Sequence, residues 1–197
     1  MTEVKNSFPL GCYREKIVIL DRDGTINEDS DDYIKSKDEW QPIPGSLEAI
    51  STLSQTGFKI YIVTNQSGLA RGYYSLETLN EIHQKMMRLL AALNGEIHGI
   101  FVCPHHPDDH CLCRKPKTAL IEQIAQATQK DLSGVLFVGD SSADIEVAHN
   151  YGLTPALVLT GKGERTLKKI NQPNLLCFNN LHHCIEAFLS SQKPSDN

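Results

Sequence analysis

The 197-residue sequence has no apolar run of the roughly 18 residues that a membrane-spanning helix needs, and aliphatic stretches such as Ile17–Leu20 are far shorter. It has no excess of basic residues either. With 19 Lys and Arg against 24 Asp and Glu, its net charge is −5, which argues against nucleic-acid binding, because that affinity rests on cations meeting phosphates. Residues 1–11 lack the charged-then-apolar layout of a secretion signal. We therefore expect a cytoplasmic protein without membrane or nucleic-acid partners.

Internal repeats and low-complexity segments are also lacking. Hydrophobic residues make up 40% of the chain and charged residues 22%, which is typical of a folded globular domain and not of a disordered chain. A chain of this length supports one domain with a sizeable core. We expect a single domain over residues 1–197, with its core at about 15–190 and surface appendages at 1–12 and 192–197.

Strand and helix patterns alternate along the chain. Short apolar or β-branched segments predict strands, and apolar residues every three or four positions predict helices. The expected strands are 17–20, 58–64, 97–102, 135–138 and 156–159, and the expected helices are 46–55, 75–93, 118–129, 142–150 and 181–190. This alternation predicts an α/β fold, a Rossmann-like parallel sheet with helices on both faces. In such sheets ligands bind beyond the carboxyl ends of the strands.

Carboxylates follow two of the expected strands. Asp21 and Asp23 come directly after strand 17–20, and Asp140 follows strand 135–138, with Asp144 four residues further on. Convergent carboxylates repel one another unless a cation lies between them, and oxygen ligands suit Mg²⁺. A nucleophilic carboxylate beside a second acid could hydrolyse a phosphomonoester. An isolated Asp-x-Asp is more often a solvated acidic turn, but here it follows a buried strand and precedes Gly-Thr.

Two further segments could bind phosphate. Thr64 begins a Thr-Asn-Gln-Ser-Gly turn after the second strand, where a hydroxyl and main-chain N–H groups can cradle phosphate oxygens. Lys115 could neutralise a phosphoryl group, and Arg114 could hold a second anionic group through two hydrogen bonds. Each segment alone is a weak signal, because polar turns and basic tetrads are common. Their order along successive strand ends, over about residues 17–163, is the stronger observation.

In that order the four segments resemble the four motifs of the haloacid dehalogenase superfamily of phosphotransferases. The resemblance implies that Asp21 is a nucleophile forming an aspartyl-phosphate and that Asp23 is the general acid and base. It implies that Thr64 and Lys115 steady the transferring phosphoryl group. It also implies a catalytic Mg²⁺ held by the Asp21 carboxylate, the Asp23 main-chain carbonyl and Asp140.

Short loops after the first two motifs leave no room for a large cap domain, so we expect an open site. The single tryptophan, Trp40, could line that opening or lie in the core.

Six of the chain's Cys and His residues lie within residues 103–113. Disulfides are a poor explanation for a chain without a secretion signal. Three thiols and one imidazole can enclose a Zn²⁺ tetrahedrally with no open position, which is typical of a structural site. Composition leaves the fourth ligand open among three histidines, and coincidental core cysteines are the alternative interpretation. The three cysteines are Cys103, Cys111 and Cys113, and the three histidines are His105, His106 and His110.

Within the superfamily, Cys-x-His…Cys-x-Cys before Arg-Lys-Pro resembles the zinc loop of bacterial heptose-bisphosphate and histidinol-phosphate phosphatases. That resemblance implies a structural Zn²⁺ on a loop that positions Arg114 and Lys115. The implied ligands are Cys103, His105, Cys111 and Cys113.

Flanking residues are similar to the heptose enzymes. They include Asn-Gln-Ser-Gly at 65–68, Cys-Pro-His-His-Pro at 103–107 and Thr-Gly-Lys-Gly at 160–163. The implied activity is removal of the C7 phosphate from D-glycero-D-manno-heptose 1,7-bisphosphate, for nucleotide-activated heptose and lipopolysaccharide core synthesis. Ser141 departs from the family members that carry Lys there. The implied substrate contacts are Asp29, Asn65, Gln66, Ser67, Arg114 and Lys115.

Two alternatives remain. Histidinol-phosphate phosphatase would use the same chemistry on another leaving group. A zinc-stabilised interaction module without catalysis is disfavoured by the intact acids and lysine. We expect a monomer that acts on a small phosphorylated sugar.

Overall fold

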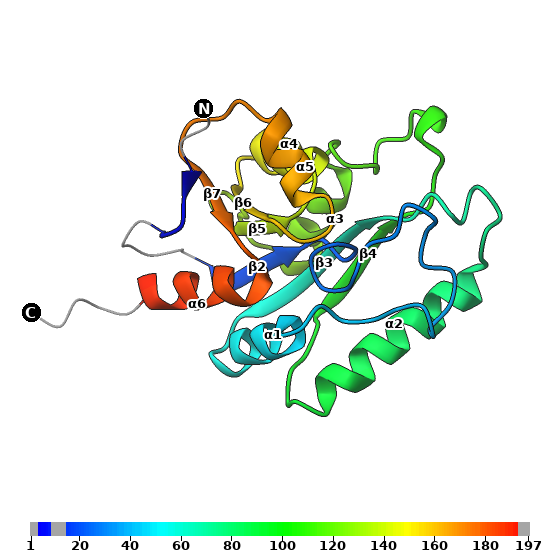
Figure 1. The fold of residues 1–197 in the computed structure, drawn as a ribbon, viewed down its shortest axis with the longest axis horizontal. Coiled ribbons are helices and arrows are strands. Elements are labelled where there is room, and N and C mark those ends of the chain that lie inside the picture. The colour runs from blue at the N-terminus through cyan, green and yellow to red at the C-terminus, as the bar shows by residue number, and fades with distance from the viewer. Residues whose placement is uncertain (1–3, 9–14, 193–197) are drawn as a thin grey trace, which may run out of the picture.

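The computed structural model describes residues 4–8 and 15–192. At its centre is a parallel seven-stranded sheet in the order β1-β7-β6-β5-β2-β3-β4 (Figure 1). The predicted α/β class with a parallel sheet is confirmed. The strands are β1 (Val4–Lys5), β2 (Ile17–Leu20), β3 (Lys59–Asn65), β4 (Gly99–Cys103), β5 (Leu136–Gly139), β6 (Thr154–Val158) and β7 (Leu175–Phe178).

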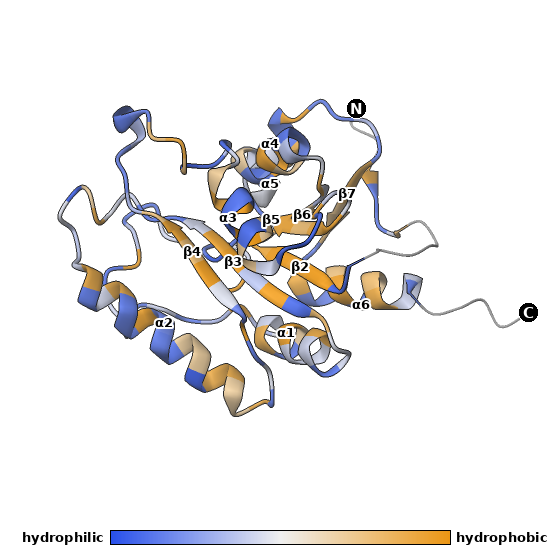
Figure 2. Ribbon diagram, turned by 180° about the vertical axis from the view of Figure 1, so that it is seen from behind, coloured by the Kyte–Doolittle hydropathy of each residue, from blue (hydrophilic) through white to orange (hydrophobic). Residues whose placement is uncertain are grey.

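Helices cover both faces of the sheet, as predicted. Helices α1 (Ser46–Gln55), α2 (Leu76–Ala91) and α6 (Leu181–Ser191) share one core cluster with Val18 and Leu20 of β2. Helices α3 (Ala119–Thr128) and α4 (Ser142–Tyr151) share the other with Ile17 and Ile19. Because β2 is buried on both faces, all four of its residues are apolar. Figure 2 shows hydrophobic strands between helices that carry hydrophilic residues. Short helices Pro107–Asp109 and α5 (Gly163–Lys169) complete the elements.

Four elements were not predicted: β1, the short helix Pro107–Asp109, α5 and β7. The expected appendage at residues 1–12 is wrong for the described residues 4–8, because β1 pairs with β7 and Phe8 is buried. The Phe8 ring lies 5.3 Å from the rings of Phe178 and Phe188. The other expected appendage residues, 1–3, 9–12 and 193–197, lie outside the described residues.

The topology brings the motif segments together. Strands β5, β2 and β3 are neighbours, so the segments that follow them leave the same edge of the sheet. Trp40 is fully buried in the core and does not line the opening. No helix in the described part of the chain is long and apolar enough to span a bilayer.

Candidate active site and candidate metal centre

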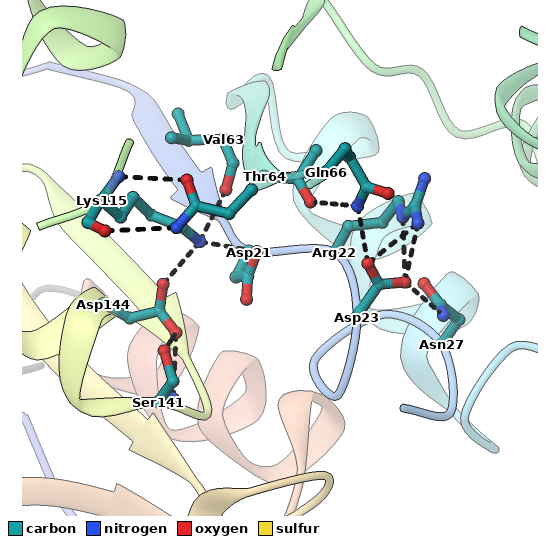
Figure 3. A network of polar contacts seen from close by, with 11 residues as sticks. Asp21, Arg22, Asp23, Asn27, Val63, Thr64, Gln66, Lys115, Ser141 and Asp144 are labelled. Atoms are coloured by element: carbon teal, nitrogen blue, oxygen red, sulfur yellow. Dashed lines mark hydrogen bonds and ion pairs between the residues drawn. The ribbon is translucent and has the colours of Figure 1, made fainter. Parts of the chain in front are cut away.

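Lys115 is the central cation of the site. It is 4% exposed, and its Nζ lies 2.7 Å from Oδ1 of Asp21 and 2.6 Å from Oδ1 of Asp144 (Figure 3). Nζ also donates to the carbonyl oxygen of Val63 at 2.9 Å. Burial opposes the charged form, but the two carboxylates outweigh it and raise the pKa of Lys115. A permanently charged ammonium therefore lies beside Asp21.

Asp21, Asp140 and Asp144 bring three buried carboxylates together, each with an oxygen within 4.8 Å of the others. Oδ2 of Asp144 accepts from the main-chain N–H and the hydroxyl of Ser141, at 2.9 and 2.6 Å. Oδ2 of Asp140 accepts from the N–H of Lys162 at 2.7 Å. Both Asp144 oxygens are thus occupied by protein donors, whereas Asp21 and Asp140 keep free lone pairs.

The negative charge at this cluster exceeds the positive charge of Lys115. Burial and the Asp144 charge raise the pKa of Asp21 to about 7. Burial and the charges of Asp21 and Asp144 raise the pKa of Asp140 to about 8. A divalent cation with oxygen ligands would relieve this repulsion, and the donor set fits one.

Two glycines make room for the Asp140 carboxylate. Gly24 has φ +81° and Gly161 has φ +54°, and a Cβ atom on either would overlap that carboxylate. Thr160 links the loop that contains Gly161 to the loop that contains Gly24, because its hydroxyl donates to the carbonyl oxygen of Gly24 at 2.6 Å. Glycine is therefore required at both positions by conformation and by space.

Asp23 faces a different set of partners. Nη2 of Arg22 donates to Oδ1 and Oδ2 of Asp23 at 2.9 and 2.8 Å, and Nδ2 of Asn27 donates to Oδ1 at 2.9 Å. Nε2 of Gln66 donates to Oδ2 at 2.7 Å and to the hydroxyl of Thr64 at 2.8 Å (Figure 3). Although burial raises the pKa of Asp23, the Arg22 charge and these hydrogen bonds lower it below the usual value.

A cavity of about 360 Å³ opens over these groups. Asn65 holds the Lys115 main chain, because Lys115 N donates to Oδ1 at 3.0 Å and Nδ2 donates to the Lys115 carbonyl at 3.2 Å. Asp29 forms an ion pair with Lys162 at 2.8 Å. Among the described residues, buried Nη1 of Arg114 has no hydrogen-bond partner. The cavity is lined by all the predicted catalytic and substrate residues, which are Asp21, Asp23, Asp29, Thr64, Asn65, Gln66, Ser67, Arg114 and Lys115, and also by Asp140.

A second cluster joins Cys103, His105, Cys111 and Cys113. Sγ of Cys111 lies 3.6 Å from Sγ of Cys103 and 3.6 Å from Sγ of Cys113. Nδ1 of His105 lies 3.7 Å from Sγ of Cys103 and 3.1 Å from Sγ of Cys113. Zn–S bonds of about 2.3 Å in a tetrahedron place sulfurs roughly 3.8 Å apart, so the spacing fits a metal ion. All three cysteines are free thiols.

The cluster lies on the loop that delivers Arg114 and Lys115. Nζ of Lys117 closes this loop by donating to the carbonyl oxygens of His110 at 2.9 Å and Cys111 at 2.6 Å. Burial opposes ionisation of Cys111, but hydrogen bonds, first that of the Arg114 N–H, lower its pKa to about 7.

Sequence reasoning did not assign roles to Arg22, Asn27, Tyr74 or Lys162. The hydroxyl of Tyr74 donates to Oε1 of Gln66 at 2.5 Å and so orients the amide that reaches Asp23. Arg22 lies within the Asp-x-Asp segment and Asn27 lies four residues after Asp23. Only these positions could have pointed to the two residues, since their partners are set by the loop conformation.

Comparisons with known proteins agree with this geometry. A family model described as HAD-hydrolase-like matches residues 112–184. The D-glycero-β-D-manno-heptose-1,7-bisphosphate 7-phosphatase of Pseudomonas putida is 52% identical over 84% of this chain and 95% of its own. The enzyme of the same name from Bordetella bronchiseptica is 50% identical over 80% of this chain and 88% of its own.

Solved structures of heptose 1,7-bisphosphate phosphatases also match this chain. The heptose 1,7-bisphosphate phosphatase of B. bronchiseptica, complexed with magnesium and phosphate, matches with a TM-score of 0.86 and 46% identity, over 88% of this chain and 98% of that one. The corresponding enzyme of Burkholderia thailandensis matches with a TM-score of 0.69 and 36% identity, over 89% of this chain and 99% of that one.

Proposed function

Because the chain belongs to the D-glycero-β-D-manno-heptose-1,7-bisphosphate 7-phosphatase family of HAD-like hydrolases, we propose that it removes the C7 phosphate of this sugar bisphosphate. The observation that carries the proposal is the Asp21–Lys115 pair beside Asp140, in a cavity that Arg114 also lines. The product would feed nucleotide-activated heptose and lipopolysaccharide core synthesis. The named relatives favour this function over histidinol-phosphate hydrolysis, and the intact acids disfavour an inactive module.

In the first step an oxygen of Asp21 attacks phosphorus, the bond between phosphorus and the C7 oxygen breaks, and Asp23 gives its proton to that oxygen. In the second step Asp23 takes a proton from water, whose oxygen attacks phosphorus and releases Asp21. The free protein holds Asp23 ionised, which is the base form. A bound phosphoryl dianion opposes that ionisation and favours the proton-carrying form needed first. Lys115 and Thr64 hold the phosphoryl oxygens.

The carboxylates of Asp21 and Asp140 and the main-chain carbonyl of Asp23 would hold Mg²⁺. When bound, the ion neutralises charge on the phosphoryl group and on the acids. Asp144 stays outside this set because both of its oxygens already accept from Lys115 and Ser141. Its task is to hold Lys115.

A structural Zn²⁺ at Cys103, His105, Cys111 and Cys113 would fix the loop that presents Arg114 and Lys115. Arg114 would bind the phosphate that remains at C1, because it lines the cavity and a guanidinium can offer a phosphate two parallel hydrogen bonds. Gln66, Ser67 and Asp29 would contact sugar hydroxyls. Asn65 would act through the Lys115 main chain, which occupies its amide. The functional unit would be a cytoplasmic monomer, one domain over residues 1–197.

The position of cleavage tests this proposal. Phosphorus NMR of the reaction should show the C7 phosphomonoester signal lost and the C1 glycosyl phosphate kept. Asp21→Asn should release no phosphate while its circular dichroism spectrum matches the unchanged protein. Cleavage at C1, or phosphate release by Asp21→Asn, would overturn the proposal.

A further inference from the structure

His83 is a buried histidine that the chemistry described above does not use. It lies in α2, is 7% exposed, and its Nε2 is 3.1 Å from Nη1 of Arg22. Arg22 has no exposed surface, and 61 positions of sequence separate it from His83. The contact thus joins α2 to the Asp-x-Asp segment through the interior.

Arg22 uses the rest of its guanidinium on Asp23. Nε donates to Oδ1 at 3.1 Å, and Nη2 donates to both carboxylate oxygens. A guanidinium has only donors, so Nε2 of His83 must accept and the ring must be neutral, with its hydrogen on Nδ1. Burial and the Arg22 charge lower the pKa of His83 to about 4, which agrees with this state.

The guanidinium of Arg22 is consequently held at two ends. Without an acceptor at His83, Nη1 would be a buried donor with no partner among the described residues, and the guanidinium would tilt toward another acceptor. Any tilt moves the Asp23 carboxylate, because three of its hydrogen bonds come from this guanidinium. Gln66 and Asn27 bind Asp23 from other directions and cannot by themselves restore the orientation of its carboxylate.

We propose that His83 is a positioning residue for the general acid: through Arg22 it fixes the direction of the Asp23 carboxylate toward the leaving oxygen. This inference rests on the proposed roles of Asp21 and Asp23. It differs from a merely structural role for His83, whose loss would lower activity on every substrate to the same extent.

The leaving group separates these two roles. A sugar alkoxide needs the proton of Asp23, whereas p-nitrophenolate leaves as a stable anion. The parameter kcat/KM reports only steps up to formation of the phosphoenzyme, which is where the leaving group departs. Misdirecting Asp23 should therefore lower kcat/KM for the heptose bisphosphate and spare that for p-nitrophenyl phosphate.

The test compares three variants of α2. His83→Leu should lower kcat/KM for the bisphosphate roughly 10-fold, part of the range general acid catalysis supplies, and change that for p-nitrophenyl phosphate less than about twofold. His83→Gln, which can place an amide oxygen near the Nε2 position, should recover most of the loss. Ile82→Val removes a core methyl from the neighbouring position and should leave the ratio of the two kcat/KM values unchanged.

A double-mutant cycle supplies the second readout. Adding His83→Leu to Asp23→Asn should cost no further activity on the bisphosphate, because His83 acts through Asp23. Equal losses on both substrates, additive losses in the cycle, or no recovery by His83→Gln would overturn the inference and leave the proposed function standing. If Asp23→Asn itself lowers kcat/KM equally for both substrates, the proposed role of Asp23 fails and this inference fails with it.

Discussion

Nζ of Lys115 lies 2.6 Å from Oδ1 of Asp144, a carboxylate with no exposed surface. Lys115 lies on the loop after β4 and Asp144 in the first turn of α4, and their pairing directs the ammonium at Asp21, 2.7 Å away. Ser141 occupies the other oxygen of Asp144 and so fixes the carboxylate. Asp144 therefore contributes to the site by orienting the residue that meets the phosphoryl group.

Removing the Asp144 charge should weaken both the fold and the activity. Asp144→Asn leaves Lys115 buried with one carboxylate where it had two. We expect the free energy of unfolding to fall by roughly 3 kcal/mol, near the lower end for broken buried pairs, because Asp21 still compensates in part. Urea unfolding measures this. Glu146→Gln, an exposed acid on the same helix, should change stability by less than about 0.5 kcal/mol. Equal stability of the two variants would contradict the assigned role.

Magnesium binding should strengthen as pH rises from about 6 to 8. The raised pKa values of Asp21 and Asp140, about 7 and about 8, mean that the metal-free folded protein holds protons that the unfolded chain has lost. Their contribution to stability accordingly declines as pH rises from about 4 through these values. Mg²⁺ must displace those protons, so its binding tightens with pH.

Thermal melts with and without Mg²⁺ check this. The Mg²⁺-induced rise in Tm should be larger at pH 8 than at pH 6, and EDTA should stop activity until Mg²⁺ is restored. A Tm rise that does not depend on pH would exclude Asp21 and Asp140 as Mg²⁺ ligands. Recovery of activity with Zn²⁺ alone would reverse the assignment of the two metals.

The Cys/His cluster should hold one zinc ion per chain. Cys111→Ser removes one of three thiolates, and we expect it to lose zinc and to be less stable and less active, because the loop carrying Arg114 is no longer fixed. Metal analysis and activity assays measure both. Cys177→Ser is the matched control, since Cys177 is a buried free thiol outside the cluster. A Cys111→Ser protein with full zinc and full activity would refute the site.

Arg114 should distinguish one phosphate from two. Arg114→Ala should lower kcat/KM for the 1,7-bisphosphate about 30-fold, the loss of ~2 kcal/mol from charge-assisted hydrogen bonds. The value for heptose 7-phosphate, which has no C1 phosphate, should change little. Arg88→Ala, at an exposed position of α2, serves as the control. A similar loss on both substrates would place Arg114 at the transferring phosphoryl group.

The sequence could predict the part of the site whose reactive residues lie at the carboxyl ends of strands. Asp21 and Asp140 directly follow strands of the parallel sheet, and Thr64 is the next-to-last residue of β3. The carboxyl ends of such strands meet at one edge. The Arg22–His83 contact could not be predicted, because a histidine on an amphipathic helix gives no sign of what it meets 61 positions away. Likewise, Asn65 carries the right amide for a sugar, and only the fold shows that Lys115 occupies it. β1 was missed because two residues carry no periodicity.

The most direct test is phosphate release by the Mg²⁺-loaded protein from heptose 1,7-bisphosphate and from histidinol phosphate at equal low concentrations. We predict a preference of several hundredfold for the bisphosphate, about 3–4 kcal/mol of transition-state discrimination. A preference for histidinol phosphate would contradict the proposed substrate, although the same nucleophile and acid could still act.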